Sequence, residues 1–193
     1  MKTTYFTEIE SPLGTITLRG TERGLTGIYM QDHRHGPEEL LRRGWQRDDR
    51  RFADARAQLE EYFAGKRKVF TVQIDREEIG GTDFQRRVWA GLEAIPYGVT
   101  ISYGELARRI EKPTAVRAVG LANGRNPLSI IVPCHRVIGA NGKLTGYGGG
   151  MERKQMLLDL EKGDSSPSDG LASHSPGNVV NSTSDRGCLP SAK

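Results

Sequence analysis

Hydrophobic and polar residues alternate along the first thirty positions, and this pattern predicts three short β-strands. The segments Tyr5–Ile9, Thr15–Leu18 and Leu25–Met30 place apolar side chains mainly at every second residue. Turn-forming residues separate the segments, with proline and glycine in Ser11–Gly14 and glycines at both ends of 20–24. We therefore expect an antiparallel meander with one face turned toward a core.

The period of the pattern then becomes helical. Residues 31–50 are polar and charge-rich and predict a loop. A helix that ends at Gly65 is indicated by apolar side chains at helical spacing: Phe52, Ala55, Leu59, Tyr62 and Phe63. The apolar positions of 69–74 predict one more strand. Residues 1–79 thus form a predicted small α/β domain, and its sequence contains no catalytic cluster.

A second predicted domain, residues 80–163, begins with helix-capping signals. Thr82–Gln85 matches the capping box, in which two side chains bond free amides of the first helical turn. Ser102–Glu105 repeats the pattern and opens a short helix. Pro113–Thr114 is expected to cap a third helix over 115–122. Two short helices joined by a tight turn resemble a helix-turn-helix.

Short elements are predicted after the helix pair. Ile130–Val132 is an apolar run that predicts a buried strand. Val137–Ile138 and Lys143–Thr145 flank Ala140–Gly142 and predict a hairpin. Gly146–Gly150 predicts a flexible loop.

The last predicted element is an amphipathic helix over Met151–Glu161. Beyond it, residues 164–193 are rich in serine and proline and hold few large apolar side chains, so we expect a disordered tail. The fold class that these elements predict is α/β of the α+β type, with a sheet domain preceding a helical domain.

The composition is that of a water-soluble chain. The 193 residues are 36% hydrophobic with a mean hydropathy of -0.55, and no stretch approaches the ~18 apolar residues of a membrane-spanning helix. The N-terminus has no apolar signal core, so we expect a cytoplasmic protein. The two cysteines, Cys134 and Cys188, cannot form a disulfide framework, and neither has the spacing of a paired metal ligand.

Positive charge is concentrated in one part of the chain. The net charge is +4, and residues 82–163 carry 12 basic and 7 acidic side chains, a local net of +5. This segment is where a polyanion would dock. An ordinary solvated surface remains the alternative on charge alone.

Candidate chemistry lies in Val132–Arg136, the sequence Val-Pro-Cys-His-Arg. A cysteine is nucleophilic as the thiolate, and a neighbouring proton acceptor favours that form. His135 could take the proton of Cys134, directly or through a water. The alternative is a structural buried cysteine beside a surface histidine, because adjacent side chains need not face each other.

The surroundings of this run resemble the O6-alkylguanine-DNA alkyltransferases of the bacterial type, also called methylated-DNA–protein-cysteine methyltransferases. The resemblance is carried by Asn126–Gly139, which contains Pro-Cys-His-Arg, and by Gly80–Trp89, Ile95–Gly98, Ser102–Glu105, Arg117–Gly120 and Gly146–Gly149. It covers roughly residues 80–162, and the N-terminal domain more loosely. It implies a ribonuclease-H-like N-terminal domain and a winged-helix-like C-terminal domain with Asn141-Gly142 in the wing.

The resemblance also implies a reaction and its residues. Cys134 would accept the alkyl group of O6-alkylguanine in DNA in a single irreversible step; whether O4-alkylthymine is also repaired stays open. His135 would act as a base through a water, and Glu161 would orient it. Asn126 would fix the turn beside the cysteine.

Other residues would bind the DNA and the extruded base. Tyr103 would donate toward guanine N3 and help to rotate the nucleotide, and Arg117 would fill the space that the base leaves. Ala118 belongs to a small-sided helix that would approach the minor groove. The guanine and its alkyl group would be surrounded by the backbone of Cys134 and Val137, the Gly148 amide and the Tyr147 ring.

Each of these residues has a plainer interpretation that the sequence leaves open. Arg117 alone suits a phosphate contact or a solvated position, and Tyr103 a residue that packs on the core. Glu161 alone suits a surface charge. Asn126 is ordinary turn chemistry by itself, and Tyr147 could anchor a loop.

The chain departs from the family pattern at two places. Some members bind a structural zinc in the N-terminal domain, but residues 1–81 hold no cysteine, so we predict no zinc and no cofactor. His33-Arg34-His35 is then expected to be solvated. Other members carry a hydroxyl residue where Gly148 stands.

Four functions are compatible with these features, in falling order of support. The first is a single-turnover alkyltransferase that acts as a monomer on double-stranded DNA. The second is a protein that binds the lesion without repairing it, against which the acceptor cysteine argues. The third is a helix-turn-helix regulator with a redox-sensing cysteine, and the fourth is a cysteine hydrolase.

Overall fold

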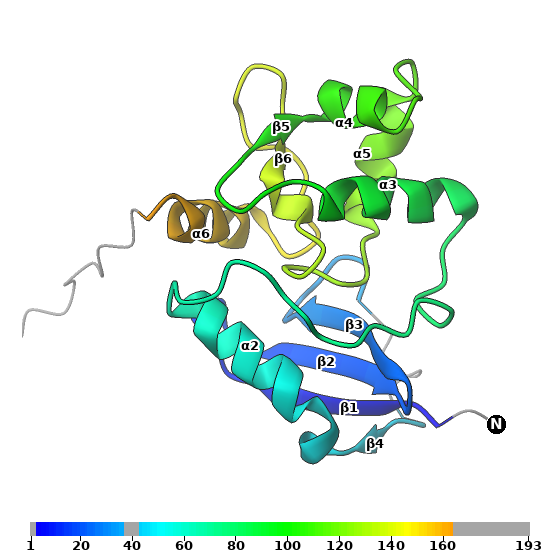
Figure 1. Ribbon diagram of the computed structural model, residues 1–193, viewed down its shortest axis with the longest axis vertical. Coiled ribbons are helices and arrows are strands. Elements are labelled where there is room, and N and C mark those ends of the chain that lie inside the picture. The colour runs from blue at the N-terminus through cyan, green and yellow to red at the C-terminus, as the bar shows by residue number, and fades with distance from the viewer. Residues whose placement is uncertain (1–2, 37–42, 164–193) are drawn as a thin grey trace, which may run out of the picture.

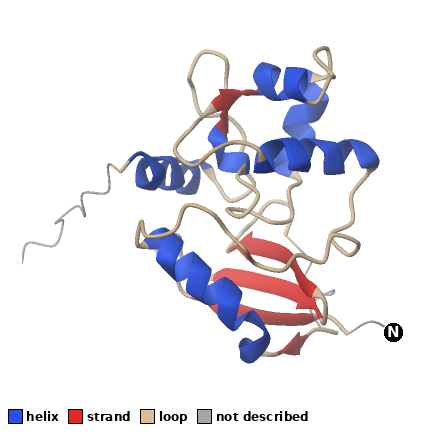
Figure 2. Ribbon diagram, viewed as in Figure 1, coloured by secondary structure: helices blue, strands red, loops and turns tan. Residues whose placement is uncertain are grey.

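The chain folds into a sheet domain followed by a helical domain (Figures 1 and 2). The computed structural model describes residues 3–36 and 43–163. The first domain holds β1 (Tyr5–Ile9), β2 (Ile16–Thr21), β3 (Gly24–Met30), β4 (Gln46–Arg47), the 3-10 helix η1 (Asp49–Phe52) and α2 (Ala53–Phe63). The second holds α3 (Asp83–Glu93), β5 (Ile101–Ser102), α4 (Tyr103–Arg109), α5 (Val116–Gly124), the 3-10 helix η2 (Cys134–Arg136), β6 (Val137–Ile138) and α6 (Met151–Lys162). The predicted α+β class is confirmed.

The N-terminal meander is confirmed. Strands β1, β2 and β3 pair antiparallel, and α2 lies across one face of the sheet (Figure 1). Ile16, Leu18 and Ile28 are completely buried because they point to that face. The prediction missed β4, which pairs parallel with β1 and makes the sheet order β3-β2-β1-β4. Its two residues are exposed and polar, so they carry no periodic signal.

Two predicted strands are wrong. Residues 69–74 form an extended segment in which only Ile74 makes a bridge, with Leu25, and Val69 is 71% exposed. Ile130–Val132 forms a turn: Ile130 has a φ of 75°, and the Val132 amide donates to the Leu128 carbonyl at 2.9 Å. Phe70, Val72 and Ile74 are partly buried against the core. Ile130 and Val132 are fully buried, so both segments hold apolar side chains although neither forms a strand.

The predicted helices are confirmed, but not all of their caps. Both side-chain bonds of the capping box at Thr82 and Gln85 are present. At Ser102 only half of the box forms: its hydroxyl accepts from the Glu105 amide, while the Glu105 carboxylate pairs with two arginines. The predicted cap at Pro113–Thr114 is wrong, because α5 begins after Ala115 without a side-chain cap.

The predicted hairpin is only a turn. The Gly139 amide donates to the Lys143 carbonyl and the Gly142 amide to the Gly139 carbonyl, each at 2.9 Å. Residues 143–145 form no strand, and β6 pairs parallel with β5. The described residues therefore contain no two-stranded wing. The predicted disordered tail and Cys188 lie outside the described residues.

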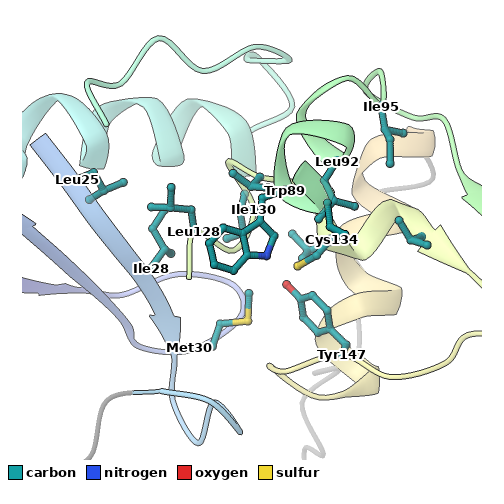
Figure 3. Packing of buried hydrophobic residues seen from close by; sticks show 14 of the residues in the cluster. Leu25, Ile28, Met30, Trp89, Leu92, Ile95, Leu128, Ile130, Cys134 and Tyr147 are labelled. Atoms are coloured by element: carbon teal, nitrogen blue, oxygen red, sulfur yellow. The ribbon is translucent and has the colours of Figure 1, made fainter. Parts of the chain in front are cut away.

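One hydrophobic core joins the two domains. Figure 3 shows Ile28 and Met30 of β3 packed toward Leu128 and Trp89. The Ile28 amide donates to the Pro127 carbonyl at 2.8 Å. The sheet is thus attached directly to the segment that leads into Cys134. Among the described residues, no helix is long and apolar enough to cross a membrane.

Candidate active site

Cys134 begins η2 and is buried, with 4% of its surface exposed. Its amide donates to the Val132 carbonyl at 2.8 Å, and its carbonyl accepts from the Asn123 side chain at 3.4 Å. Burial raises the pKa of the Cys134 thiol, although the Asn126 side chain and the Lys154 charge act in the opposite direction. The thiol is therefore neutral at rest, and nucleophilic attack requires a proton acceptor.

His135 is completely buried and contacts Glu161. Its Nε2 lies 2.9 Å from Glu161 Oε1, so the alternative of a surface histidine is wrong. Burial lowers the pKa of His135, which keeps the ring neutral. Because its partner is a carboxylate, we assign the proton to Nε2, which leaves the lone pair on Nδ1. Nδ1 has no hydrogen-bond partner among the described residues.

Glu161 accepts five hydrogen bonds and is not a surface charge. Besides His135, Oε1 accepts from the Tyr62 hydroxyl and from Arg136 Nη2, both at 2.8 Å. Oε2 accepts from the Gly98 amide at 3.0 Å and from Arg136 Nε at 2.8 Å. Burial alone would raise the pKa of Glu161, but the hydrogen bonds from His135 and Arg136 outweigh it and hold the pKa below its usual range. The carboxylate is ionised.

Asn126 fixes the turn before Cys134. Its side-chain nitrogen donates to the Val132 carbonyl at 2.7 Å, and its side-chain oxygen accepts from the Leu128 amide at 3.0 Å. Both bonds are buried, so the side chain replaces backbone partners that a strand would otherwise supply. The turn is therefore fixed by a side chain rather than by the sheet.

Tyr103 lies between α5 and the backbone at Thr145–Gly146. Its hydroxyl donates to the Thr145 carbonyl at 3.1 Å, and its ring lies against Gly120 of α5. Burial raises the pKa of Tyr103. Arg117 and Ala118 are exposed on α5. The structure thus brings Tyr103 to the site and leaves Arg117 and Ala118 at the surface.

Three buried polar atoms gather near Cys134 without a partner in the described part of the chain. They are the Asn123 side-chain oxygen, His135 Nδ1 and the Tyr147 hydroxyl. Figure 3 shows the Tyr147 hydroxyl pointing toward the sulfur of Cys134. Buried polar groups normally have partners. Their grouping marks a site that can receive polar atoms of a ligand or a water.

Sequence reasoning missed Lys154, which is completely buried in α6. Its Nζ donates to the Val137 carbonyl at 2.6 Å and to the Thr145 carbonyl at 2.9 Å. Burial lowers the pKa of Lys154 to about 8. The missed signal is a helical stripe that Lys154 shares with Leu157, Leu158 and Glu161, all of which are buried.

Two N-terminal residues also reach the site, although that domain was expected to hold none of it. Tyr62 of α2 contacts Glu161, as described above. His33 was expected to be solvated, but it is half-buried, with Nε2 3.4 Å from Ser129 Oγ. Its burial depends on the packing between the domains, which sequence does not display. Among the described residues, no group of three or more His, Cys, Asp or Glu side chains could hold a metal ion.

Two family profiles match most of the chain. Residues 3–76 match the profile described as "6-O-methylguanine DNA methyltransferase, ribonuclease-like domain". Residues 83–163 match the one described as "6-O-methylguanine DNA methyltransferase, DNA binding domain".

Named relatives and solved structures agree with these profiles. A methylated-DNA–protein-cysteine methyltransferase of Mycolicibacterium paratuberculosis is 54% identical over 154 residues, 80% of this chain and 90% of the relative. One of Methanosarcina acetivorans is 50% identical over 157 residues, 81% and 97% of the two chains. The crystal structure of Mycobacterium tuberculosis OGT in complex with DNA is similar with a TM-score of 0.77 at 53% identity, covering 82% of this chain and 93% of that one.

Proposed function

Because this chain belongs to the 6-O-methylguanine DNA methyltransferase family, we propose that it repairs DNA by moving an alkyl group from guanine O6 to Cys134. The sulfur attacks the alkyl carbon, the bond between that carbon and O6 breaks, and guanine keeps the electron pair. A thioether is not hydrolysed back to a thiol, so each chain reacts once. The names of the relatives support this reaction class.

The observation that carries the proposal is the buried contact of Glu161 with His135, the residue that follows Cys134 in the chain. Nε2 is bound to an ionised carboxylate at 2.9 Å, and the unpartnered Nδ1 bears the lone pair. We assign His135 as the base that takes the thiol proton through a bridging water. Glu161 then stabilises the imidazolium, and Asn126 holds the turn of Cys134.

Double-stranded DNA is the proposed partner. The alkylated O6 lies inside a duplex, so the base has to leave the stack before the sulfur can reach it. The local net charge of +5 and the exposed Arg117 and Ala118 on α5 support a minor-groove contact. In this proposal Arg117 fills the vacated stack and Tyr103 donates toward guanine N3. One chain meets one lesion, so we infer a monomer.

The acceptor pocket is proposed to use the segments on either side of Cys134. The backbone carbonyls of Cys134 and Val137 would accept hydrogen bonds from the guanine amino group. The Gly148 amide would donate a hydrogen bond to O6. Tyr147, whose buried hydroxyl has no partner among the described residues, would form the wall around the alkyl group. A reduced thiol is required, which agrees with the cytoplasmic location that we propose.

The test is intact-mass measurement and peptide mapping after incubation with a duplex that holds one O6-methylguanine. We expect one added methyl group per chain, on the peptide that contains Cys134, and saturation at one equivalent. An unmodified duplex and the Cys134→Ser variant are the controls. No mass change with selective retention of the lesion-bearing duplex would favour a lesion-binding protein instead, and a methyl group on another residue would refute the assignment of Cys134.

A further inference from the structure

The ring of His33, from the N-terminal domain, lies directly behind Gly148. A Cβ added to Gly148 would lie 2.5 Å from His33 Cε1 and 2.7 Å from Nε2, closer than such atoms approach. The backbone of Gly148 is not in the left-handed region, so conformation does not demand glycine there. The absence of a side chain at 148 and the presence of the imidazole are therefore sterically matched.

Several contacts hold His33 in this place. Its Nε2 lies 3.4 Å from the hydroxyl of Ser129, which is completely buried, and its ring meets the Tyr29 ring edge-on with centroids 5.9 Å apart. Burial, and secondarily the charges of His35 and Arg153, lowers the pKa of His33 to about 4. The ring is thus neutral and fixed between the two domains.

Hydrogen bonds to the backbone carbonyls of Gly148 and Gly149 hold this loop against the N-terminal domain. The Arg34 amide donates to the Gly148 carbonyl at 2.9 Å. Arg153 Nη1 donates to the Gly149 carbonyl at 2.8 Å and to the Gln31 carbonyl at 3.0 Å. A shift of Gly148 toward His33 would have to displace the ring as well.

This arrangement bears on the room available at Cys134. The sulfur is buried, and the Tyr147 hydroxyl points toward it (Figure 3). Gly148 follows Tyr147 in the chain, so an alkyl group that displaces Tyr147 also moves Gly148. A larger alkyl group needs a larger displacement. The His33 ring opposes a displacement of Gly148 toward it, because the ring already occupies the place of a side chain at 148.

We propose that His33 is a specificity-determining residue, whose ring limits the alkyl groups that Cys134 accepts to small ones such as methyl. This inference rests on the proposed alkyl transfer. It adds a residue of the N-terminal domain to the acceptor pocket, and it makes the substrate range depend on the pair formed by His33 and Gly148.

The test compares single-turnover rates on duplexes that carry O6-methylguanine or O6-benzylguanine. His33→Ala should raise the benzyl-to-methyl rate ratio by about tenfold, within the range that pocket size contributes to discrimination. His35→Ala removes an exposed imidazole two residues away and should leave the ratio unchanged. An unchanged ratio in His33→Ala would overturn the inference, whereas a wild-type chain that transfers no methyl group would overturn the proposed function itself.

A reciprocal variant keeps the inference testable if His33→Ala perturbs folding. Gly148→Ala should slow methyl transfer, because the new Cβ meets the imidazole, and the double variant His33→Ala with Gly148→Ala should recover at least part of that loss. A double variant that is no faster than Gly148→Ala would contradict the steric pairing. Thermal unfolding of all variants separates loss of the fold from loss of the rate.

Discussion

The hydroxyl of Tyr62 donates a hydrogen bond to Oε1 of Glu161 at 2.8 Å, across 99 residues of sequence. Tyr62 belongs to α2 of the sheet domain, whereas His135, Arg136 and Gly98, the other donors to this carboxylate, belong to the helical domain. The sheet domain thus contacts the proposed catalytic carboxylate directly. Tyr62 is a positioning residue in the proposed mechanism, since it acts through Glu161.

Tyr62→Phe removes this hydrogen bond and keeps the ring packing. A bond to a charged group contributes about 1.5–3 kcal/mol, so we expect a loss of stability of that order. The Glu161 carboxylate then interacts more strongly with His135, and this raises the pKa of His135. The acidic limb of the rate profile for methyl transfer should therefore move to higher pH.

Tyr97→Phe is the matched control for this prediction. It also removes a tyrosine hydroxyl, one that donates to the Leu160 carbonyl at 3.3 Å rather than to the carboxylate. The acidic limb should stay in place in this variant. If both variants shift the limb equally, or neither does, Tyr62 has no specific effect on the His135–Glu161 pair.

Cys134→Ser should abolish methyl transfer and leave the affinity for DNA within about twofold of wild type, because one buried atom changes and no charge is lost. Transfer is followed by mass, and affinity by fluorescence anisotropy on the lesion-bearing duplex. Cys188→Ser, which removes the other cysteine, should transfer one methyl group as wild type does. Continued transfer by Cys134→Ser would refute the proposed acceptor.

Arg117→Ala should slow repair of a duplex far more than reaction with the free modified base. On saturating duplex we expect a loss of about tenfold or more, in line with the 1–3 kcal/mol of an arginine contact to bases. The free base needs no extrusion, so its reaction should be nearly unaffected. Equal losses on both substrates would contradict the base-extrusion role.

Arg125→Ala serves as the charge-matched comparison for Arg117. Arg125 is exposed and caps the C-terminal end of the same helix. Its loss should weaken duplex binding through charge alone, in a salt-dependent way, while the rate at saturating duplex stays near that of wild type. If Arg125→Ala slows repair as much as Arg117→Ala does, the loss of rate in both variants is due to the lost charge.

Glu161→Gln should destabilise the fold by about 3–5 kcal/mol at neutral pH, because Arg136 is left buried without its charged partner. The pKa of Glu161 is lower in the folded chain than its usual value of 4.5. Its stabilisation is therefore complete above pH 4.5 and declines as the pH falls below that value. The difference between wild type and variant, from denaturant unfolding at several pH values, should shrink in acid; a difference independent of pH would contradict the ionised state.

The sequence predicted the regular elements better than the connections between them. The meander and the helices carry their own period of two or 3.6 residues, so local pattern was sufficient. The predicted strand at Ile130–Val132 is a turn. Ile130 and Val132 are buried, which explains their apolar character, but burial alone does not specify a ladder. The two-residue strand β4 has no periodic signal at all.

The candidate site was predictable where its residues are adjacent in the chain or carry the family resemblance. Cys134 and His135 follow each other, whereas Glu161 was expected only from the family resemblance. The buried stripe that Glu161 shares with Lys154 on α6 was not recognised in the sequence. The spacing did not show which way His135 points. Its contact with Glu161 depends on how α6 packs against η2.

The sequence by itself determined the family resemblance, the two-part α+β fold and the reactive run around Cys134, because these depend on local pattern and on residues close together in the chain. Only the tertiary structure decided that Tyr62 contacts Glu161 and that the His33 ring lies behind Gly148. Both contacts join residues about a hundred positions apart, and they exist because one core packs the sheet domain against the loops of the helical domain.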